Sequence, residues 1–156
     1  FQDLNVYLKA KLMENDRVNL KKITEDFISN YYGVAAPKIL EFFEACNANM
    51  RNTYTDSNAI FDDHNNKKYW PKDVVSNLIS ICDDAVNLVS NSNETEERKT
   101  LLINRVNREK ATAVYMFVEY GYASLFNKKD YKNFFKETCA IFGITHVDIS
   151  TKVEQW

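Results

Sequence analysis

The chain has 156 residues and a formal net charge of -2, with 45% hydrophobic and 27% charged residues. These proportions are typical of one folded domain and exclude a disordered tail or linker. Basic and acidic residues are nearly equal in number and spread along the sequence, so no basic face is predicted and no nucleic-acid partner is expected. No apolar stretch reaches the ~20 residues of a membrane span, and no charged-then-apolar leader opens the sequence.

Three glycines and two prolines are too few for the many turns of a β-sandwich or β-barrel. We therefore predict an all-α fold: a single helical domain over residues 1–156, built as a bundle of about six helices with a short extended C-terminal tail. Because the sequence begins at Phe1 without a methionine, we expect it to be a C-terminal fragment of a larger multidomain protein.

The first half of the chain has three helical patterns. Apolar residues at helical spacing predict a helix over residues 3–13, with Asp3 as its cap. Asn19 is expected to cap a second helix that ends at Gly33, since glycine tolerates the left-handed conformation common at helix C-termini. Pro37 suits the first turn of a third helix, whose apolar stripe continues to residue 54.

A long polar segment separates these helices from the next pair. Residues 55–69 have no sustained period and are predicted to form the one long loop. A helix is expected over residues 71–91, followed by a long helix over residues 94–126. Either Ser92 or Asn93 is expected to cap the long helix, which would form the spine of the bundle.

The C-terminal part combines a helix with a β-like tail. Glycine costs about 1 kcal/mol relative to alanine inside a helix, so a kink is expected at Gly121. An amphipathic helix is predicted over residues 130–141 and is ended by Gly143. Residues 144–156 alternate and are β-branched, which predicts an extended strip. This strip lacks a partner strand in the sequence, so we expect it to lie against an absent part of a larger protein.

Cysteines and loop acids are the first candidates for chemistry. Cys46, Cys82 and Cys139 fall on the apolar faces of three predicted helices and are expected to be core thiols. The loop offers oxygen and nitrogen ligands, but the twelfth position of a calcium loop that starts at Asp56 is Lys67, where such a loop needs glutamate. No metal site is therefore predicted. The loop residues considered are Asp56, Asn58, Asp62, Asp63 and His64.

No catalytic or cofactor-binding residue is assigned, because the chain has no phosphate loop, no nucleophile elbow and no His-Glu-x-x-His helix. Glu119 lies among tyrosines, where a desolvated acid could serve as a general acid, although a hydrogen-bonded glutamate in a packing layer is the favoured interpretation. Aromatic side chains beside loops are candidates for glycan or interdomain contacts. These are Tyr32, Tyr54, Tyr69 and Trp70.

A recurring pattern links the first forty residues to a known family. It consists of a Tyr-Leu-x-Ala-Lys-Leu helix at Tyr7 to Leu12, a turn at Asn15, a helix ending in Tyr-Tyr-Gly at Tyr31 to Gly33, and Ala35 to Pro37 before an aromatic-rich helix. It resembles the helical segment after the (β/α)₈ barrel of large secreted bacterial proteins of unknown function, related to glycoside hydrolases such as α-glucuronidases and hexosaminidases. The tail from Gly143 also looks like the end of that region.

The resemblance implies an exported, extracellular or periplasmic, carbohydrate-active parent, whose catalytic carboxylates lie in the barrel upstream of Phe1. Three hypotheses describe what the chain does. The preferred one rests on the resemblance and is a non-catalytic accessory domain that packs on the upstream barrel of the same polypeptide. The second is a stand-alone module that binds a glycan or a protein, and the third is an enzyme that uses Glu119. No cofactor is expected.

Overall fold

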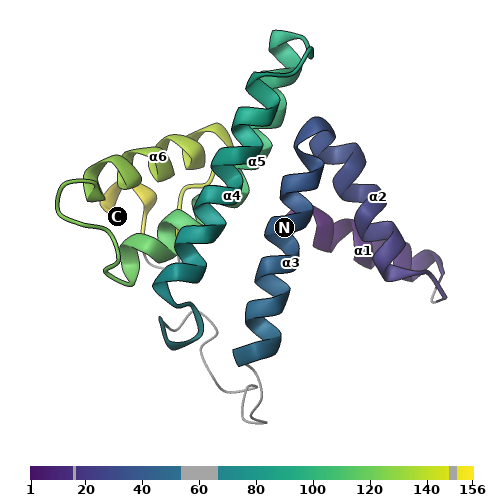
Figure 1. The fold of residues 1–156 in the computed structure, drawn as a ribbon, viewed down its shortest axis with the longest axis horizontal. Coiled ribbons are helices and arrows are strands. Elements are labelled where there is room, and N and C mark those ends of the chain that lie inside the picture. The colour runs from purple at the N-terminus through teal and green to yellow at the C-terminus, as the bar shows by residue number, and fades with distance from the viewer. Residues whose placement is uncertain (16, 54–66, 148–150) are drawn as a thin grey trace.

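The computed structural model describes residues 1–15, 17–53, 67–147 and 151–156 (Figure 1). Within these ranges the chain is helical and contains no β-strand, so the all-α prediction is confirmed for the described residues. The α-helices are α1 (Gln2–Glu14), α2 (Leu20–Tyr32), α3 (Ala36–Thr53), α4 (Lys72–Ser90), α5 (Glu96–Glu119) and α6 (Lys128–Ile141). Short 3-10 helices are η1 (Gly33–Ala35), η2 (Lys67–Tyr69) and η3 (Val153–Gln155).

The centre of the molecule is an antiparallel pair formed by α4 and α5 (Figure 1). Helix α3 packs along α4, and α6 packs on α5. Helices α1 and α2 lie beyond α3, on the side of the molecule away from α6 (Figure 1). One hydrophobic cluster nevertheless includes residues from α1 through η3, such as Leu4, Ile39, Leu102 and Val153.

Apolar periodicity explains why α4 and α5 take the central place. Both helices have apolar residues at positions three and four apart, so each presents a continuous stripe to its neighbour. Leu78, Cys82, Leu102 and Val106 on these stripes have no exposed surface. Beyond residue 110, α5 is buried on several sides, since α4 and α6 both pack against it.

The two residues predicted to begin and end α2 do so in the structure. The Asn19 side chain accepts a hydrogen bond from the Lys22 backbone N–H at 3.1 Å, as predicted for a cap. Gly33 ends the helix with φ 53°, which confirms the predicted stop. Asp3 does not cap α1, because the helix already begins at Gln2 and Asp3 lies inside the first turn.

Both ends of α5 differ from the prediction. Thr95 caps its start by accepting a hydrogen bond from the Arg98 N–H at 3.2 Å, while the Ser92 hydroxyl is engaged by the carbonyl of Val89 in α4. The helix ends at Glu119 instead of continuing to Phe126. Gly121 does not kink the helix. It lies just after the helix end and has a positive φ of 72°, the left-handed conformation common at helix C-termini.

The described part of the tail pairs with itself. His146 and Lys152 form an antiparallel bridge, and the Trp156 ring then packs on Phe135 and Tyr115, with centroids 4.5 and 5.2 Å away. The described residues hold no partner strand, but the tail bridges to itself and packs on α6, which the sequence did not predict; its contact with another part of a larger protein stays a prediction. An extended strip needs only a local reversal to satisfy its own backbone groups.

Candidate functional site

A buried carboxylate in α5 is the most unusual polar group of the described structure. Glu109 is 7% exposed, and its neighbours along the helix stripe are apolar. Its Oε1 accepts a hydrogen bond from the Tyr32 hydroxyl at 2.8 Å, and its Oε2 lies 2.6 Å from the backbone nitrogen of Phe1. We call these three residues the Glu109 cluster. They join the start of α1, the end of α2 and the middle of α5.

Burial fixes the protonation state of the tyrosine in this cluster. Removal from water raises the pKa of Tyr32 well above its ordinary value, and the adjacent Glu109 raises it further. The phenol is therefore neutral and available as a hydrogen-bond donor to the carboxylate. A buried carboxylate that receives donors on both oxygens is stabilised where it lies.

A second, more exposed polar layer surrounds the cluster. The Asp3 carboxylate accepts hydrogen bonds from the Tyr31 hydroxyl at 2.7 Å and from Arg108 at 2.8 Å. Arg105 lies over the Tyr31 ring, 3.8 Å from its centroid, and donates to the Tyr31 carbonyl at 2.6 Å. This layer holds α1 and the end of α2 against α5 by charge-assisted hydrogen bonds and a cation–π contact.

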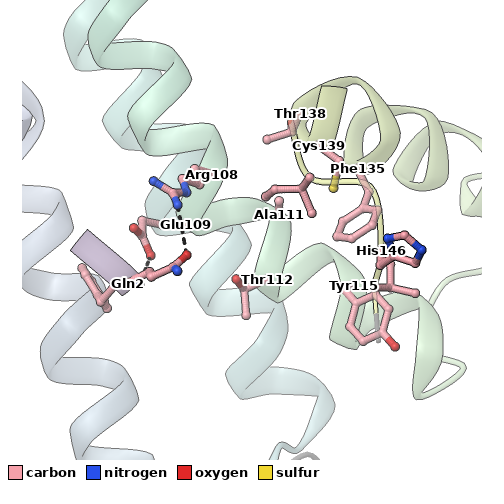
Figure 2. A pocket seen from close by; sticks show the side chains of 13 residues that line it. Gln2, Arg108, Glu109, Ala111, Thr112, Tyr115, Phe135, Thr138, Cys139 and His146 are labelled. Atoms are coloured by element: carbon pink, nitrogen blue, oxygen red, sulfur yellow. Dashed lines mark hydrogen bonds and ion pairs between the residues drawn. The ribbon is translucent and has the colours of Figure 1, made fainter. Parts of the chain in front are cut away.

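A cavity of about 280 Å³ opens beside Glu109 (Figure 2). It lies between α5, α6, the first residues of the chain and the start of the tail. Figure 2 shows its aromatic end at Tyr115, Phe135 and His146, and its polar end at Glu109 and Arg108. Its volume lies just below the range of about 300–1,000 Å³ that is usual for ligand pockets. Among the described residues, no buried side-chain polar atom lacks a hydrogen-bond partner.

The three thiols are unpaired and lie in or near the core. Cys82 and Cys139 are buried and Cys46 is partly buried, as expected for core residues. Burial raises the pKa of Cys46 to about 11 and raises the pKa of Cys82 and of Cys139 as well. Thiols with raised pKa values stay protonated and are poor nucleophiles at neutral pH.

The aromatic candidates do not gather into one surface. Tyr32 is 2% exposed and its hydroxyl is engaged by Glu109, so its ring cannot stack on a glycan in this structure. Tyr69 is also buried, and its carbonyl accepts a hydrogen bond from Asn49 of α3. Trp70 is half-buried, next to Tyr69. Tyr54 lies outside the described residues.

Glu119 is not the desolvated acid that the tyrosine-rich sequence allowed. It is exposed at the end of α5, where its carboxylate accepts a hydrogen bond from the Trp156 indole. The buried glutamate is Glu109, which the sequence analysis missed. A signal existed, because Glu109 takes the place of an apolar residue on the stripe formed by Leu102, Val106 and Ala113.

The histidines and loop acids give no metal centre in the described chain. His146 is exposed, and its Nδ1 lies 2.9 Å from the Thr145 hydroxyl. Asp56, Asn58, Asp62, Asp63 and His64 lie outside the described residues. Elsewhere in the described ranges, no three His, Cys, Asp or Glu side chains come together in a way that could hold a metal ion.

Over its described residues the chain is helical, and its buried carboxylate, Glu109, has a hydrogen-bond partner on each oxygen. None of its described helices is long and apolar enough to cross a membrane. Comparison with known proteins finds no matching family model, no matching curated protein and no matching solved structure.

Proposed function

We propose that this chain is a non-catalytic helical accessory domain that packs against the upstream catalytic barrel of a glycoside-hydrolase-like polypeptide. In this proposal it forms a bundle of about six helices with a short extended tail. The parent acts on carbohydrate in an extracellular or periplasmic compartment. The domain stabilises the barrel and shapes one wall of its substrate cleft.

The observation that carries the proposal is the state of the Glu109 cluster. A general acid must reach its substrate and exchange a proton with it. Glu109 borders the cavity of Figure 2, but it is only 7% exposed and each of its oxygens already has a donor within 2.8 Å. The residues that the family resemblance emphasises, Tyr31 and Tyr32, are engaged in holding α1 and α2 on α5. The cluster therefore supports a scaffold role for this motif.

The outer face of α1 supports contact with another part of the polypeptide. Val6 and Met13 are 64% and 89% exposed, whereas Leu4 is the one buried residue of this helix. Positions 6 and 13 are two helical turns apart and lie on the same face. Apolar side chains exposed in a row on one helix are typical of an interface.

The sequence upstream of Phe1 gives the first test. Reading the coding sequence in that direction should reveal a (β/α)₈ barrel with a pair of carboxylates at the carboxyl ends of its strands. The longer polypeptide should then hydrolyse glycosides, while the chain described here should not. A coding sequence without such a barrel, or hydrolysis by this chain alone, would refute the proposal.

The contact with the barrel has its own test in the longer polypeptide. Charged substitutions at Val6 and Met13 should lower the temperature at which the barrel unfolds and leave the unfolding of the isolated chain nearly unchanged. Asn5→Glu, which adds the same charge at an exposed position about 100° around α1 from Val6, is a matched control. Equal effects of all three changes would contradict a specific docking face.

The alternative is a stand-alone module that binds a glycan or a protein. A groove of about 560 Å³ between α2 and α3, lined by Leu20, Leu40 and Phe43 among other residues, favours this reading. Fluorescence titration with oligosaccharides, using Phe43→Ala as the variant, would support it if the chain responds and the variant does not. A chain without any response across sugar classes removes the glycan version.

A further inference from the structure

The turn between α5 and α6 exposes two adjacent apolar side chains. Leu125 is 92% exposed and Phe126 is 96% exposed, and no other large apolar side chain in the described residues exceeds 89%. This turn forms an outer edge of the molecule (Figure 1). Burying a leucine and a phenylalanine is worth several times the thermal energy, so their shared exposure calls for an explanation.

Backbone and side-chain hydrogen bonds hold this turn in place. The N–H groups of Tyr122 and Ala123 both donate to the Phe117 carbonyl, at 3.0 and 3.2 Å. The Ser124 hydroxyl bonds to Asn127 at 2.9 Å, and the Lys128 N–H donates to the Ser124 carbonyl, also at 2.9 Å. Leu125 and Phe126 therefore project from a defined reversal of the chain.

Two segments bring lysines to this turn. Lys128 and Lys129 come after Asn127 at the start of α6 and are exposed. From the other side, Lys67 lies 4.8 Å from the centroid of the Tyr122 ring, and the Tyr122 hydroxyl donates to the Trp70 carbonyl at 2.9 Å. These contacts place residues 67–73 beside the turn.

Charge on these two segments is opposite in sign to that of the chain. Residues 67–73 and 120–130 together contain five lysines and two aspartates, Asp73 and Asp130, within a chain of net charge -2. The turn is thus an apolar tip set in a locally positive surface. A negatively charged partner with an apolar interior complements both properties.

We infer that the turn containing Leu125 and Phe126 is an anchor that inserts into the surface of a membrane rich in anionic lipid. The two side chains enter the boundary between headgroups and acyl chains, while Lys128, Lys129 and Lys67 contact the phosphates. Two apolar side chains are too small for the core of a stable protein interface, and the lysines of the same turn and of residues 67–73 favour an anionic lipid surface over a protein partner. This property goes beyond the proposed function and does not depend on it.

Sedimentation with vesicles tests the inference. The chain should bind vesicles of phosphatidylcholine with phosphatidylserine and should bind vesicles of phosphatidylcholine alone much more weakly. The double variant Leu125→Ser/Phe126→Ser should bind the anionic vesicles at least about tenfold more weakly. Both side chains are almost fully exposed, so this variant should unfold at the same temperature as the parent chain.

Matched variants distinguish binding through this turn from non-specific binding to vesicles. Met13→Ser removes an equally exposed apolar side chain from α1 and should leave vesicle binding unchanged. Lys128→Glu/Lys129→Glu should weaken binding, whereas Lys9→Glu/Lys22→Glu makes the same change of charge elsewhere and should weaken it far less. Failure of the parent chain to bind anionic vesicles, or equal losses in the matched variants, would overturn the inference.

Discussion

Helices α1 and α5 are both rich in apolar residues but differ in how they are held. Helix α5 buries nine side chains, while α1 buries only Leu4. The apolar residues of α1 point in several directions, and the helix is held by the hydrogen bonds that Asp3 accepts from Tyr31 and Arg108 and by the contact between Phe1 and Glu109. The difference shows that the burial of a helix depends on how many other helices pack against it and on how regular its apolar stripe is. The fraction of apolar residues in the helix predicts its burial less well.

The largest expected loss of stability lies on the α5 side. Leu102 is fully buried, so Leu102→Ala should lower the free energy of unfolding by about 3 kcal/mol through lost burial and the remaining cavity. Leu101, one position earlier and 42% exposed, is the control, and Leu101→Ala should cost under about 1 kcal/mol. Denaturant unfolding followed by circular dichroism measures both. Similar losses would contradict the stripe assigned to α5.

A smaller loss of stability is expected at the contact between the end of α2 and α5. Tyr32→Phe leaves a buried carboxylate without one donor and should cost about 2 kcal/mol. Tyr31→Phe removes a similar hydroxyl from Asp3, but this carboxylate is half-exposed and keeps Arg108, so the cost should be about 1 kcal/mol. The same unfolding measurement ranks the pair, and the reverse order would argue against a buried Glu109 cluster.

Gly33, which joins α2 to α3, should be the next most sensitive position. Its backbone at φ 53° and ψ -125° is a conformation that L side chains rarely adopt, and a Cβ there would lie 3.4 Å from Leu102. Gly33→Ala should therefore cost about 1.5 kcal/mol. Gly143→Ala also meets a positive φ but has open space around it, so its cost should be smaller.

The pH dependence of stability should reveal the partial burial of Cys46 in α3. Burial raises the pKa of Cys46 from an ordinary value of 9.0 to about 11. The unfolded chain releases this proton first, so the stability contributed by the neutral thiol is complete below pH 9 and is lost as pH rises towards 11. In Cys46→Ala, stability should fall less over this interval than in the parent chain. An unchanged decline would show that other groups cause it.

The features predicted correctly from sequence are those with local causes. Asn19 begins α2 through its own side chain and Gly33 ends α2 through its own backbone. The residues next to them are therefore enough to predict where this helix begins and ends. The start of α5 is harder: the sequence predicts Ser92 or Asn93 as its cap, because both residue types cap helices. Thr95 serves this role once the Ser92 hydroxyl is engaged at the end of α4. Gly121 ends a helix because of backbone geometry that a glycine permits but does not dictate.

The candidate site was predictable only in part. The apolar stripe of α5 marks Glu109 as a buried acid, but its partner Tyr32 lies 77 positions earlier in the sequence. No periodicity connects residues so far apart, so the sequence predicts Tyr32 only as an aromatic beside a loop that could contact a glycan or another domain. The same limit applies to Trp156, which reaches Phe135 and Tyr115 only after the tail turns back.

The short connection between α4 and α5 has a consequence for the order of folding. Closing a short loop costs little chain entropy, whereas bringing Tyr32 to Glu109 must close a loop of 77 positions. We expect the α4–α5 hairpin to form in the rate-limiting transition state and α1 to dock afterwards. Leu78→Ala should then slow refolding, while Leu4→Ala should mainly accelerate unfolding, which stopped-flow kinetics can separate. Helix α1 would then dock last during folding and detach first during unfolding.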